Sequence, residues 1–305
     1  MNKPIMIMMM GVAKAGKTTR AKQLAKEFDA EVFSPSVVAQ ELYGQSAPSS
    51  MSKAHAVMER RLLDALKAGR NVIYDDENLH SKFRAHFVRR VRATCDALCR
   101  CEIVTADFMQ SRQRSKAVSD EDFEARIYKG AFKQFQVPVP AEGWDEVTIY
   151  HSTDYNIGKI LDEYNDMPQY NPHHSLTFGE HMYATWKNLP FNCEPEAEMA
   201  AMLHDIGKPY CITFRNAHGK VDGMAHYYGH EILGAYLVLS HTLWDKSPEY
   251  CLRVAQYIQY HMLPYTAPSE DDAEQWTTKM LKKKGFDDDF ITNLLALHRA
   301  DKKAR

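Results

Sequence analysis

A glycine-rich turn near the N-terminus constrains the fold of this chain more than any other feature. The apolar run IMIMMM at residues 5–10 leads into GVAKAGKTTR at residues 11–20, and the apolar residues that follow have helical spacing. A strand, a tight glycine turn and a helix in this order bring backbone N–H groups together around phosphate oxygens. The stretch therefore predicts a buried strand that ends in a nucleotide-phosphate site.

This loop fits the pattern G-x-x-x-x-G-K-[ST], which runs from Gly11 to Thr18. Lys17 would supply a positive charge to the β- and γ-phosphates of ATP, and Thr18 would supply an oxygen to Mg²⁺. A chance glycine-rich turn is the alternative, but the strand before the loop and the helix after it argue against chance. The residues expected to bind ATP are Gly11, Ala15, Gly16, Lys17, Thr18 and Thr19.

The rest of the first half alternates short apolar runs with helical patterns. Such alternation predicts a parallel sheet with helices on both faces. Two prolines and several turn formers between residues 151 and 174 place a domain boundary near residue 155. We therefore expect an α/β domain over residues 1–155 and an all-α domain over residues 156–305, with no strand in the second. Further strands are predicted at residues 30–34, 71–76, 101–107 and 145–150, and one of the helices at residues 120–135.

The composition excludes several classes of protein. Charged residues make up 26% of the chain and the formal net charge is −2, so any nucleic-acid binding requires a local basic patch. Six cysteines among 305 residues do not form a disulfide framework, which favours a reducing cytoplasm. The first apolar run is too short for a signal peptide, and no stretch reaches transmembrane length.

Charged residues that follow two of the predicted strands are candidates for phosphoryl transfer. Asp75 and Asp76 end the run NVIYDD, where a phosphate-loop fold places a carboxylate near the metal or the acceptor; a helix cap is the alternative for one of them. Arg112 and Arg114 follow the next strand and could close over the transferred phosphoryl group, although solvated arginines fit the pattern equally well.

Basic residues also lie along the predicted helix that follows Asp75. A solvated face is the default interpretation, but this helix could guide a polynucleotide backbone past the site. Its arginines are Arg84, Arg89, Arg90 and Arg92, and residues 282–284 form a second short basic run.

Histidines concentrate in the second half, with three in residues 1–150 and eleven in residues 151–305. His204 and Asp205 are adjacent in MLHDIGKP, where the following glycine and proline permit a helix to break so that both side chains reach one metal. Any single histidine is more often structural than a ligand, but four imidazoles and two carboxylates on separate predicted helices suit two divalent transition ions. Asp205 is the natural bridge, and two such ions promote hydrolysis of phosphate esters. The six candidates are His181, His204, Asp205, His230, His261 and Asp301.

The first half resembles the small P-loop kinase domain of phage polynucleotide kinases and related bacterial ATPases, over roughly residues 4–150. The segments that carry the resemblance are GVAKAGKTT, VIYDDENLHSKFR, RQRSKAV and FQVPVPAEGWDEVTIY. The resemblance implies that Lys17 and Thr18 match the ATP-phosphate and Mg²⁺ residues, that Asp75 matches the strand-end aspartate, and that Arg114 or Arg112 matches the lid arginine.

The segment EVFSPSVVAQEL departs from this family. Where the family usually has an aspartate as general base and an arginine three residues later, this chain has Ser36 and Ala39. A serine cannot accept a proton as a carboxylate does. Either the acceptor differs, or another group such as Asp76 is the base, or phosphoryl transfer is weak.

The second half resembles the HD-domain phosphohydrolases through HSLTFGEH, MLHDIGKP, YGHE and LHRADK, over about residues 171–303. The resemblance implies a first metal bound by His181, His204, Asp205 and Asp301, and a second completed by His230 and His261. Mn²⁺, Co²⁺, Ni²⁺ and Fe²⁺ are the candidate ions, and Lys208 could contact the substrate phosphate. The histidines without a matching role are His173, His174, His226 and His298.

The combination is similar to phage and bacterial fusions that repair broken RNA ends. It implies a 5′-OH polynucleotide kinase that uses ATP and Mg²⁺, and a 3′-phosphatase or 2′,3′-cyclic phosphodiesterase. RNA or DNA ends would be the substrates, with a nucleic-acid ligase in the same pathway and no role for a membrane. Two alternatives remain open. One is a kinase of nucleosides, nucleotides or modified bases joined to an HD nucleotidase, and the other is an HD phosphohydrolase gated by ATP bound to a P-loop domain that transfers nothing.

Overall fold

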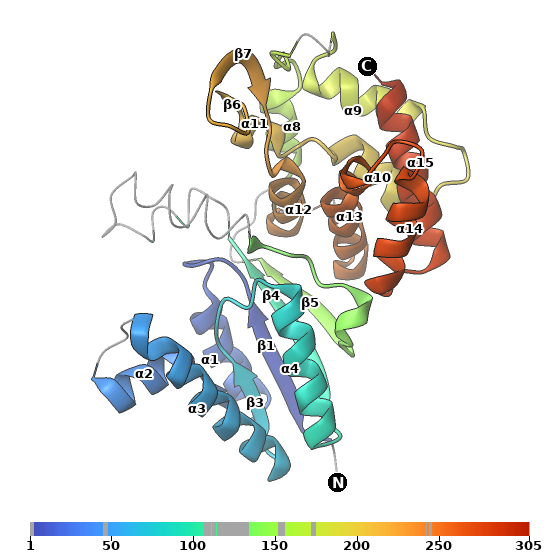
Figure 1. Cartoon of the computed structure of the whole chain (residues 1–305). Coiled ribbons are helices and arrows are strands. Elements are labelled where there is room, and N and C mark those ends of the chain that lie inside the picture. Colours follow the sequence, from blue (N-terminus) through green and yellow to red (C-terminus); the bar gives the residue numbers. More distant parts are fainter. Residues whose placement is uncertain are drawn as a thin grey trace. The chain divides into compact units, whose positions relative to one another are not determined.

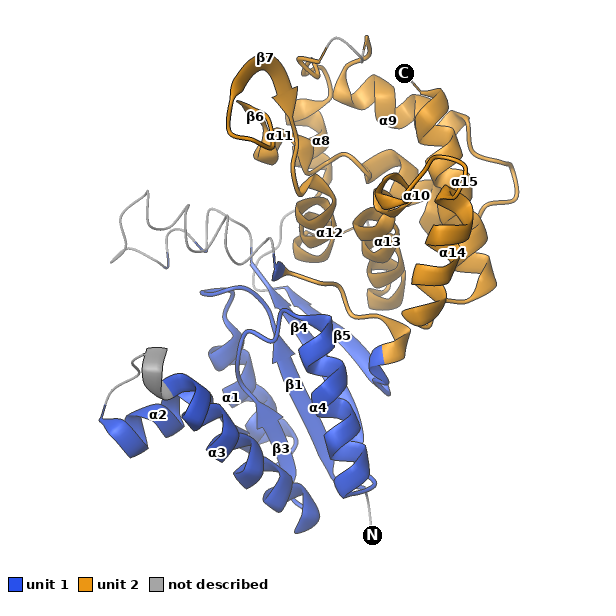
Figure 2. Ribbon diagram, viewed as in Figure 1, with its two compact units in different colours: residues 1–134, 142–152 blue, residues 135–141, 153–305 orange. Residues whose placement is uncertain are grey.

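The computed structural model of the chain describes residues 3–44, 48–106, 111, 114, 134–151, 156–171, 175–241, 243 and 246–304. The chain divides into two compact units, which are coloured separately in Figure 2. The first comprises Met1–Gln134 and Glu142–Ser152, and the second comprises Phe135–Ala141 and Thr153–Arg305. Most of the helix predicted over residues 120–135 lies outside the described residues.

Five parallel strands form the sheet of the first unit, in the order β2-β3-β1-β4-β5 (Figure 1). The predicted parallel sheet is therefore confirmed. The apolar run IMIMMM is the central strand, and all of its residues after the first are buried, as expected for a strand covered on both faces. The strands are β1 (Ile5–Met10), β2 (Ala30–Phe33), β3 (Asn71–Tyr74), β4 (Leu98–Thr105) and β5 (Glu146–His151).

Helices cover both faces of this sheet. Met6 and Met8 of β1 belong to one apolar core with residues of the third and fourth helices. Arg20 of the first helix instead bonds Glu102 on β4 at 2.8 Å, and Glu102 is the neighbour of Met9 in the sheet. Successive side chains of a strand point to opposite faces, so the first helix lies on the other face from these two. The helices are α1 (Lys17–Glu27), α2 (Pro35–Tyr43), α3 (Pro48–Lys67) and α4 (Ser81–Thr94).

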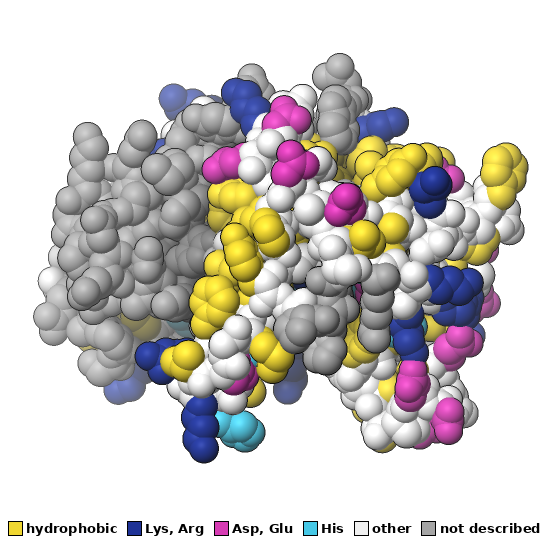
Figure 3. All heavy atoms as spheres, turned by 90° about the horizontal axis from the view of Figure 1, so that it is seen from above, with side chains coloured by type: hydrophobic (Ala, Val, Ile, Leu, Met, Phe, Trp, Pro, Cys, Tyr) yellow, Lys and Arg dark blue, Asp and Glu magenta, His cyan; other side chains and the backbone are white. Residues whose placement is uncertain are grey.

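One of the four arginines expected on the surface of α4 is buried instead. The Arg84 guanidinium donates to both carboxylate oxygens of Glu142, at 2.8 and 2.7 Å, and none of its side chain is exposed. Arg90 and Arg92 are engaged in ion pairs with acidic side chains. On the face drawn in Figure 3, basic and acidic side chains of the described residues are interspersed, without an extended basic patch. The idea that all four arginines guide a polynucleotide is therefore wrong for Arg84.

The second unit is mostly helical, and its central helices pack on one another. The helices α9 (Phe178–Lys187), α10 (Pro195–Leu203) and α15 (Asp288–Lys303) are in mutual contact. The helix α13 (Pro248–Tyr260) packs on both α10 and α12 (His230–Ser240). No helix in the described ranges is long and apolar enough to cross a membrane. The helices are α8 (Gly158–Tyr164), α9 (Phe178–Lys187), α10 (Pro195–Leu203), α11 (Lys208–Cys211), α12 (His230–Ser240), α13 (Pro248–Tyr260), α14 (Ala273–Lys283) and α15 (Asp288–Lys303), with short 3-10 turns at Pro140–Glu142 and Leu263–Thr266.

A β-hairpin corrects the expectation that the second unit has no strand. β6 (Thr213–Arg215) and β7 (Val221–His226) pair antiparallel between α11 and α12. The turn between them is stabilised by Asn216, whose side-chain oxygen accepts two backbone N–H bonds, and by Gly219 with a φ of 79°. The strands are short and largely exposed, so they lack the buried alternation by which a strand is recognised in a sequence.

Candidate active sites

The glycines of the phosphate loop allow its backbone to pack tightly against the sheet. A Cβ atom on Gly11 would lie 2.2 Å from the Val104 carbonyl oxygen, so no larger residue fits there without a shift of backbone. Gly16 caps α1 in the left-handed region, with a φ of 107°. The first turn of α1 has no acidic residue, which leaves its positive dipole end available to an anion.

Three side chains of the first unit converge beside this loop. The Thr18 hydroxyl donates to Asp75 Oδ2 at 2.8 Å, and Lys17 Nζ donates to the Val12 carbonyl at 2.8 Å. Burial raises the pKa of Asp75, which the Thr18 hydrogen bond and the Lys17 charge oppose. Burial likewise lowers the pKa of Lys17, against the charges of Glu77 and Asp75. A hydroxyl and a carboxylate side by side, next to a lysine, fit Mg²⁺ and nucleotide phosphates.

Arg114 lies on the phosphate loop. Its Nη1 atom donates to the carbonyls of Lys14 and Ala15, at 3.2 and 3.3 Å. Arg114 therefore lies beside the loop expected to bind ATP, and its role as the lid arginine stays a prediction. Arg112, the other candidate, lies outside the described residues.

A histidine that no sequence motif indicated lies beside the second aspartate at the end of β3. His55 of α3 places Nε2 3.4 Å from Asp76 Oδ2, and its Nδ1 is 3.3 Å from the Tyr74 hydroxyl. Ser36 is exposed, and its hydroxyl lies 2.9 Å from the Ser34 hydroxyl, whereas Ala39 is fully buried in the core. The Asp76 carboxylate is thus paired with an imidazole from another helix, a contact that no local sequence pattern encodes.

The structure brings all six candidate metal ligands of the second unit together, from five different helices or their ends. Within each of two groups, the ligand atoms lie within 4.8 Å of one another. The close approach of α11 and α12 helps to assemble them, because a Cβ on Gly207 would lie 2.2 Å from the His230 carbonyl oxygen. One group is His181, His204 and Asp301, and the other is Asp205, His230 and His261.

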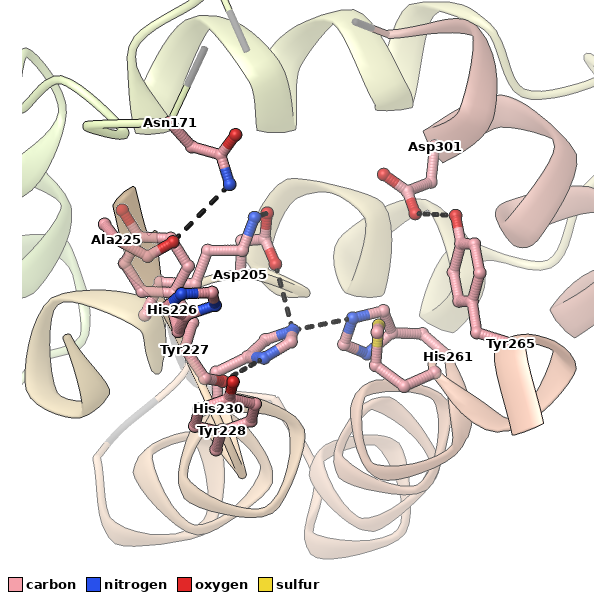
Figure 4. A pocket seen from close by; sticks show the side chains of 12 residues that line it. Asn171, Asp205, Ala225, His226, Tyr227, Tyr228, His230, His261, Tyr265 and Asp301 are labelled. Carbon is pink, nitrogen blue, oxygen red and sulfur yellow. Dashed lines mark hydrogen bonds and ion pairs between the residues drawn. The ribbon is translucent and has the colours of Figure 1, made fainter. Parts of the chain in front are cut away.

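Asp205 faces both groups. Its Oδ2 atom lies 3.3 Å from His181 Nε2 and 3.4 Å from His204 Nε2. Its Oδ1 atom lies 3.3 Å from His230 Nε2, and the carboxylate is buried (Figure 4). A carboxylate that directs one oxygen to each group is arranged as a bridging ligand between two ions.

The four imidazoles are all oriented by backbone carbonyls. In each of them Nδ1 lies 2.7–2.9 Å from a carbonyl oxygen, so Nδ1 carries the proton and Nε2 is directed into the cluster. The Nε2 atoms then approach in pairs, His181 with His204 at 3.3 Å and His230 with His261 at 3.2 Å. Two ring nitrogens so close require a shared proton or a cation between them, which fits transition-metal ligation.

The pKa values of several groups in the cluster are strongly shifted. Burial lowers the pKa of His181, but hydrogen bonds to Asp205 and Asp301 outweigh it and raise the pKa to about 10. Burial and the neighbouring imidazole of His230 lower the pKa of His261 to about 3. Burial raises the pKa of Asp205, yet Lys208 and other neighbours hold it well below its usual range. A metal cation would match this charge pattern after displacing the proton of His181.

We expect the stability of the metal-free protein to fall as the pH rises from 6.5 towards 10. A histidine whose pKa is raised on folding stabilises the folded state fully below its unfolded value near 6.5, and this contribution is lost as the pH approaches about 10. A bound cation replaces that proton, so the thermal midpoint with excess Mn²⁺ should exceed the midpoint in a chelator by more at pH 9 than at pH 6.5. Thermal unfolding at both pH values measures the difference; a gap that narrows with pH would contradict the assignment.

Lys208 and a cavity complete the surroundings of the cluster. Lys208 is nearly buried, with Nζ 2.6 Å from Asp205 Oδ2 and 3.0 Å from Gln169 Oε1. Tyr265 donates to Asp301 Oδ2 at 3.0 Å, and neither this tyrosine nor Gln169 belongs to a motif that the sequence could reveal. A cavity of about 320 Å³ is lined by Lys208, Tyr265 and both carboxylates of the cluster.

Comparisons with known proteins identify both halves. A family profile for the AAA domain matches residues 6–136, and a profile for the HD domain matches residues 173–304. A search of curated proteins finds no match. The chain therefore joins a P-loop kinase-like domain to an HD phosphohydrolase domain, with the ATP-binding fold in the first and the His/Asp clusters in the second.

Several solved structures show a low similarity to part of this chain. The PezAT toxin–antitoxin system of Streptococcus pneumoniae is 15% identical, over 50% of this chain and 70% of that chain, with a TM-score of 0.40. The APS kinase of Mycobacterium tuberculosis is 14% identical, over 53% and 96%, with a TM-score of 0.35. A gluconokinase of Sinorhizobium meliloti is 10% identical, over 53% and 90%, with a TM-score of 0.34. Identities and scores this low transfer no substrate to this chain.

Proposed function

We propose that the protein heals nucleic-acid ends, chiefly those of RNA. The first unit would phosphorylate a 5′-OH end with ATP, and the second would remove a 3′-phosphate or open a 2′,3′-cyclic phosphate. The observation that carries the proposal is the presence of two sites for phosphate chemistry in one chain, one with phosphate-loop geometry and one with a cluster of six metal-ligand side chains.

In the second unit, the chain's own residues bind and orient. When bound, two divalent transition ions would supply an activated water and neutralise charge on the phosphate ester. Asp205 would hold both ions, the Nδ1 bonds to carbonyls keep the imidazoles in the ligating tautomer, and Lys208 adds a positive charge at the cavity wall.

In the first unit, we assign proton transfer to Asp76, with His55 as its positioning residue. The acceptor oxygen forms a bond to the γ-phosphorus, the bond from that phosphorus to the β–γ bridging oxygen breaks, and ADP leaves. The hydroxyl proton passes to the Asp76 carboxylate. The His55 imidazole lies 3.4 Å from Oδ2 and fixes the orientation of the carboxylate.

Asp76→Asn should lower the rate of label transfer from ATP by about 10²–10⁴-fold, because it removes the proton acceptor and keeps the shape. His55→Asn should lower the same rate by less, about 10–100-fold, as for residues that orient a reacting group. ATP affinity should be unchanged in both, and Asp96→Asn, at an exposed aspartate paired with Lys3, serves as the matched control. Wild-type rates in Asp76→Asn would mean that another group is the base.

One experiment tests the proposed function as a whole. The protein is incubated with γ-labelled ATP and a 5′-OH oligoribonucleotide, and separately with Mn²⁺, Co²⁺ or Ni²⁺ and an oligonucleotide that has a 3′-phosphate or a cyclic phosphate end. Label transfer together with phosphate release or ring opening supports end healing. Release from mononucleotides alone would overturn it in favour of a metabolic enzyme.

A small-molecule kinase joined to a nucleotidase is the second candidate, and one observation favours it. Ser36 is exposed and Ala39 is buried where the resembling polynucleotide kinases have an aspartate and an arginine. Adding free nucleosides to the labelling assay, in competition with the oligonucleotide, separates the two candidates by which acceptor takes the label.

A further inference from the structure

The unexpected hairpin supplies one wall of the cavity at the metal cluster. The segment from Ala225 to Tyr228, which ends β7 and leads into α12, lines the same cavity as Asp205, His230 and His261 (Figure 4). Because α12 begins at His230, the hairpin is connected directly to a metal-ligand residue. Side chains at the end of β7 are therefore beside any phosphate that reaches the cluster.

Two of these side chains form a flat aromatic surface. The rings of His226 and Tyr228 are stacked with their centroids 5.5 Å apart and an angle of 4° between their planes. His226 is held in place by Asp222, whose Oδ2 atom lies 2.9 Å from Nε2. Tyr228 remains 50% exposed, so its ring is accessible to a ligand from solvent.

The cavity thus combines two kinds of recognition. Its wall includes four of the six ligand residues and Lys208, which suit a phosphate. The same wall includes aromatic rings, which suit a planar group. A nucleotide has both features a short distance apart. A sugar phosphate or glycerol phosphate would leave the aromatic surface unused.

We propose that the Tyr228–His226 pair stacks on the nucleobase of the nucleotide that carries the scissile phosphate. This inference rests on the proposed phosphohydrolase function of the second unit. Stacking on an aromatic ring is available to every base, so this surface would bind ends of any sequence. An enzyme that repairs breaks at arbitrary positions needs such tolerance.

The test compares two oligonucleotides that end in a 3′-phosphate, one with a base on its last nucleotide and one abasic there. With Mn²⁺, the wild-type kcat/KM should be about 10–100-fold higher for the end that has its base. Tyr228→Ala should lower kcat/KM for that end to the abasic value and leave the abasic substrate unchanged. Tyr228→Phe should restore the preference, because the ring and not the hydroxyl does the stacking.

Two controls separate the possible failures. Tyr183→Ala removes an equally exposed tyrosine on α9 and should change nothing. An unchanged rate on the abasic substrate also reports that the neighbouring His230 is undisturbed. If the wild type releases no phosphate from either substrate, the proposed function fails. If it releases phosphate from both equally well and Tyr228→Ala has no effect, the stacking inference is wrong while the function stands.

Discussion

Asp205→Ala is expected to abolish phosphate release from 3′-phosphate ends and to leave ATP binding intact. One oxygen of this carboxylate lies 3.3 Å from His181 Nε2 and the other 3.3 Å from His230 Nε2, so both groups lose a ligand at once. Residues that merely orient metal ligands cost about 10–100-fold in affinity or activity when removed, so the loss of a shared ligand should exceed about 100-fold. Phosphate release with Mn²⁺ and equilibrium ATP binding measure the two effects.

The variant also removes the carboxylate that pairs with Lys208, whose Nζ atom lies 2.6 Å from Asp205 Oδ2. The unpaired ammonium group could destabilise the unit. Asp205→Asn preserves the volume and one oxygen, and its thermal unfolding shows whether lost activity reflects lost folding. Asp162→Ala, at an exposed aspartate of α8, is the control for general effects of removing a carboxylate. Loss of ATP binding together with phosphate release would argue against two independent sites.

The parts of these sites that the sequence reveals are those with local patterns or rare residue types. The phosphate loop is contiguous from Gly11 to Thr18, and steric rules relate its glycines to its geometry. Histidines at the ends of separate helical patterns indicate a metal cluster because few other functions need so many imidazoles. Both features depend on spacing along the chain, which is what a sequence contains.

The parts that the sequence does not reveal depend on contacts across long separations. His55 is paired with Asp76 only because α3 packs beside the end of β3, and an isolated histidine in a helical pattern gives no sign of it. Arg84 was expected to be solvated, but it is buried because the carboxylate of Glu142, 58 residues away, compensates its charge. The hairpin was missed because its short strands pack little apolar surface. In each case tertiary structure decides the environment of a residue whose local pattern is ambiguous.

Lys17→Ala should lower label transfer to a 5′-OH oligoribonucleotide by about 10²–10³-fold, the loss typical of removing one group that stabilises transition-state charge. Lys17 lies in the phosphate loop beside Thr18 and Asp75, where its charge would meet the transferred phosphate. Lys26→Ala, in the last turn of the same helix, is the matched control and should transfer label at the wild-type rate.

The same variant separates end healing from gating by ATP. If the two units act as independent enzymes, phosphate release by Lys17→Ala should equal that of the wild type, with and without ATP. If the first unit is instead a regulator, the wild type should transfer label to no acceptor, its phosphate release should respond to ATP, and Lys17→Ala should abolish that response. Allosteric coupling requires a difference in ATP affinity between two states of the protein, so a variant that cannot hold ATP phosphates removes the coupling at its source.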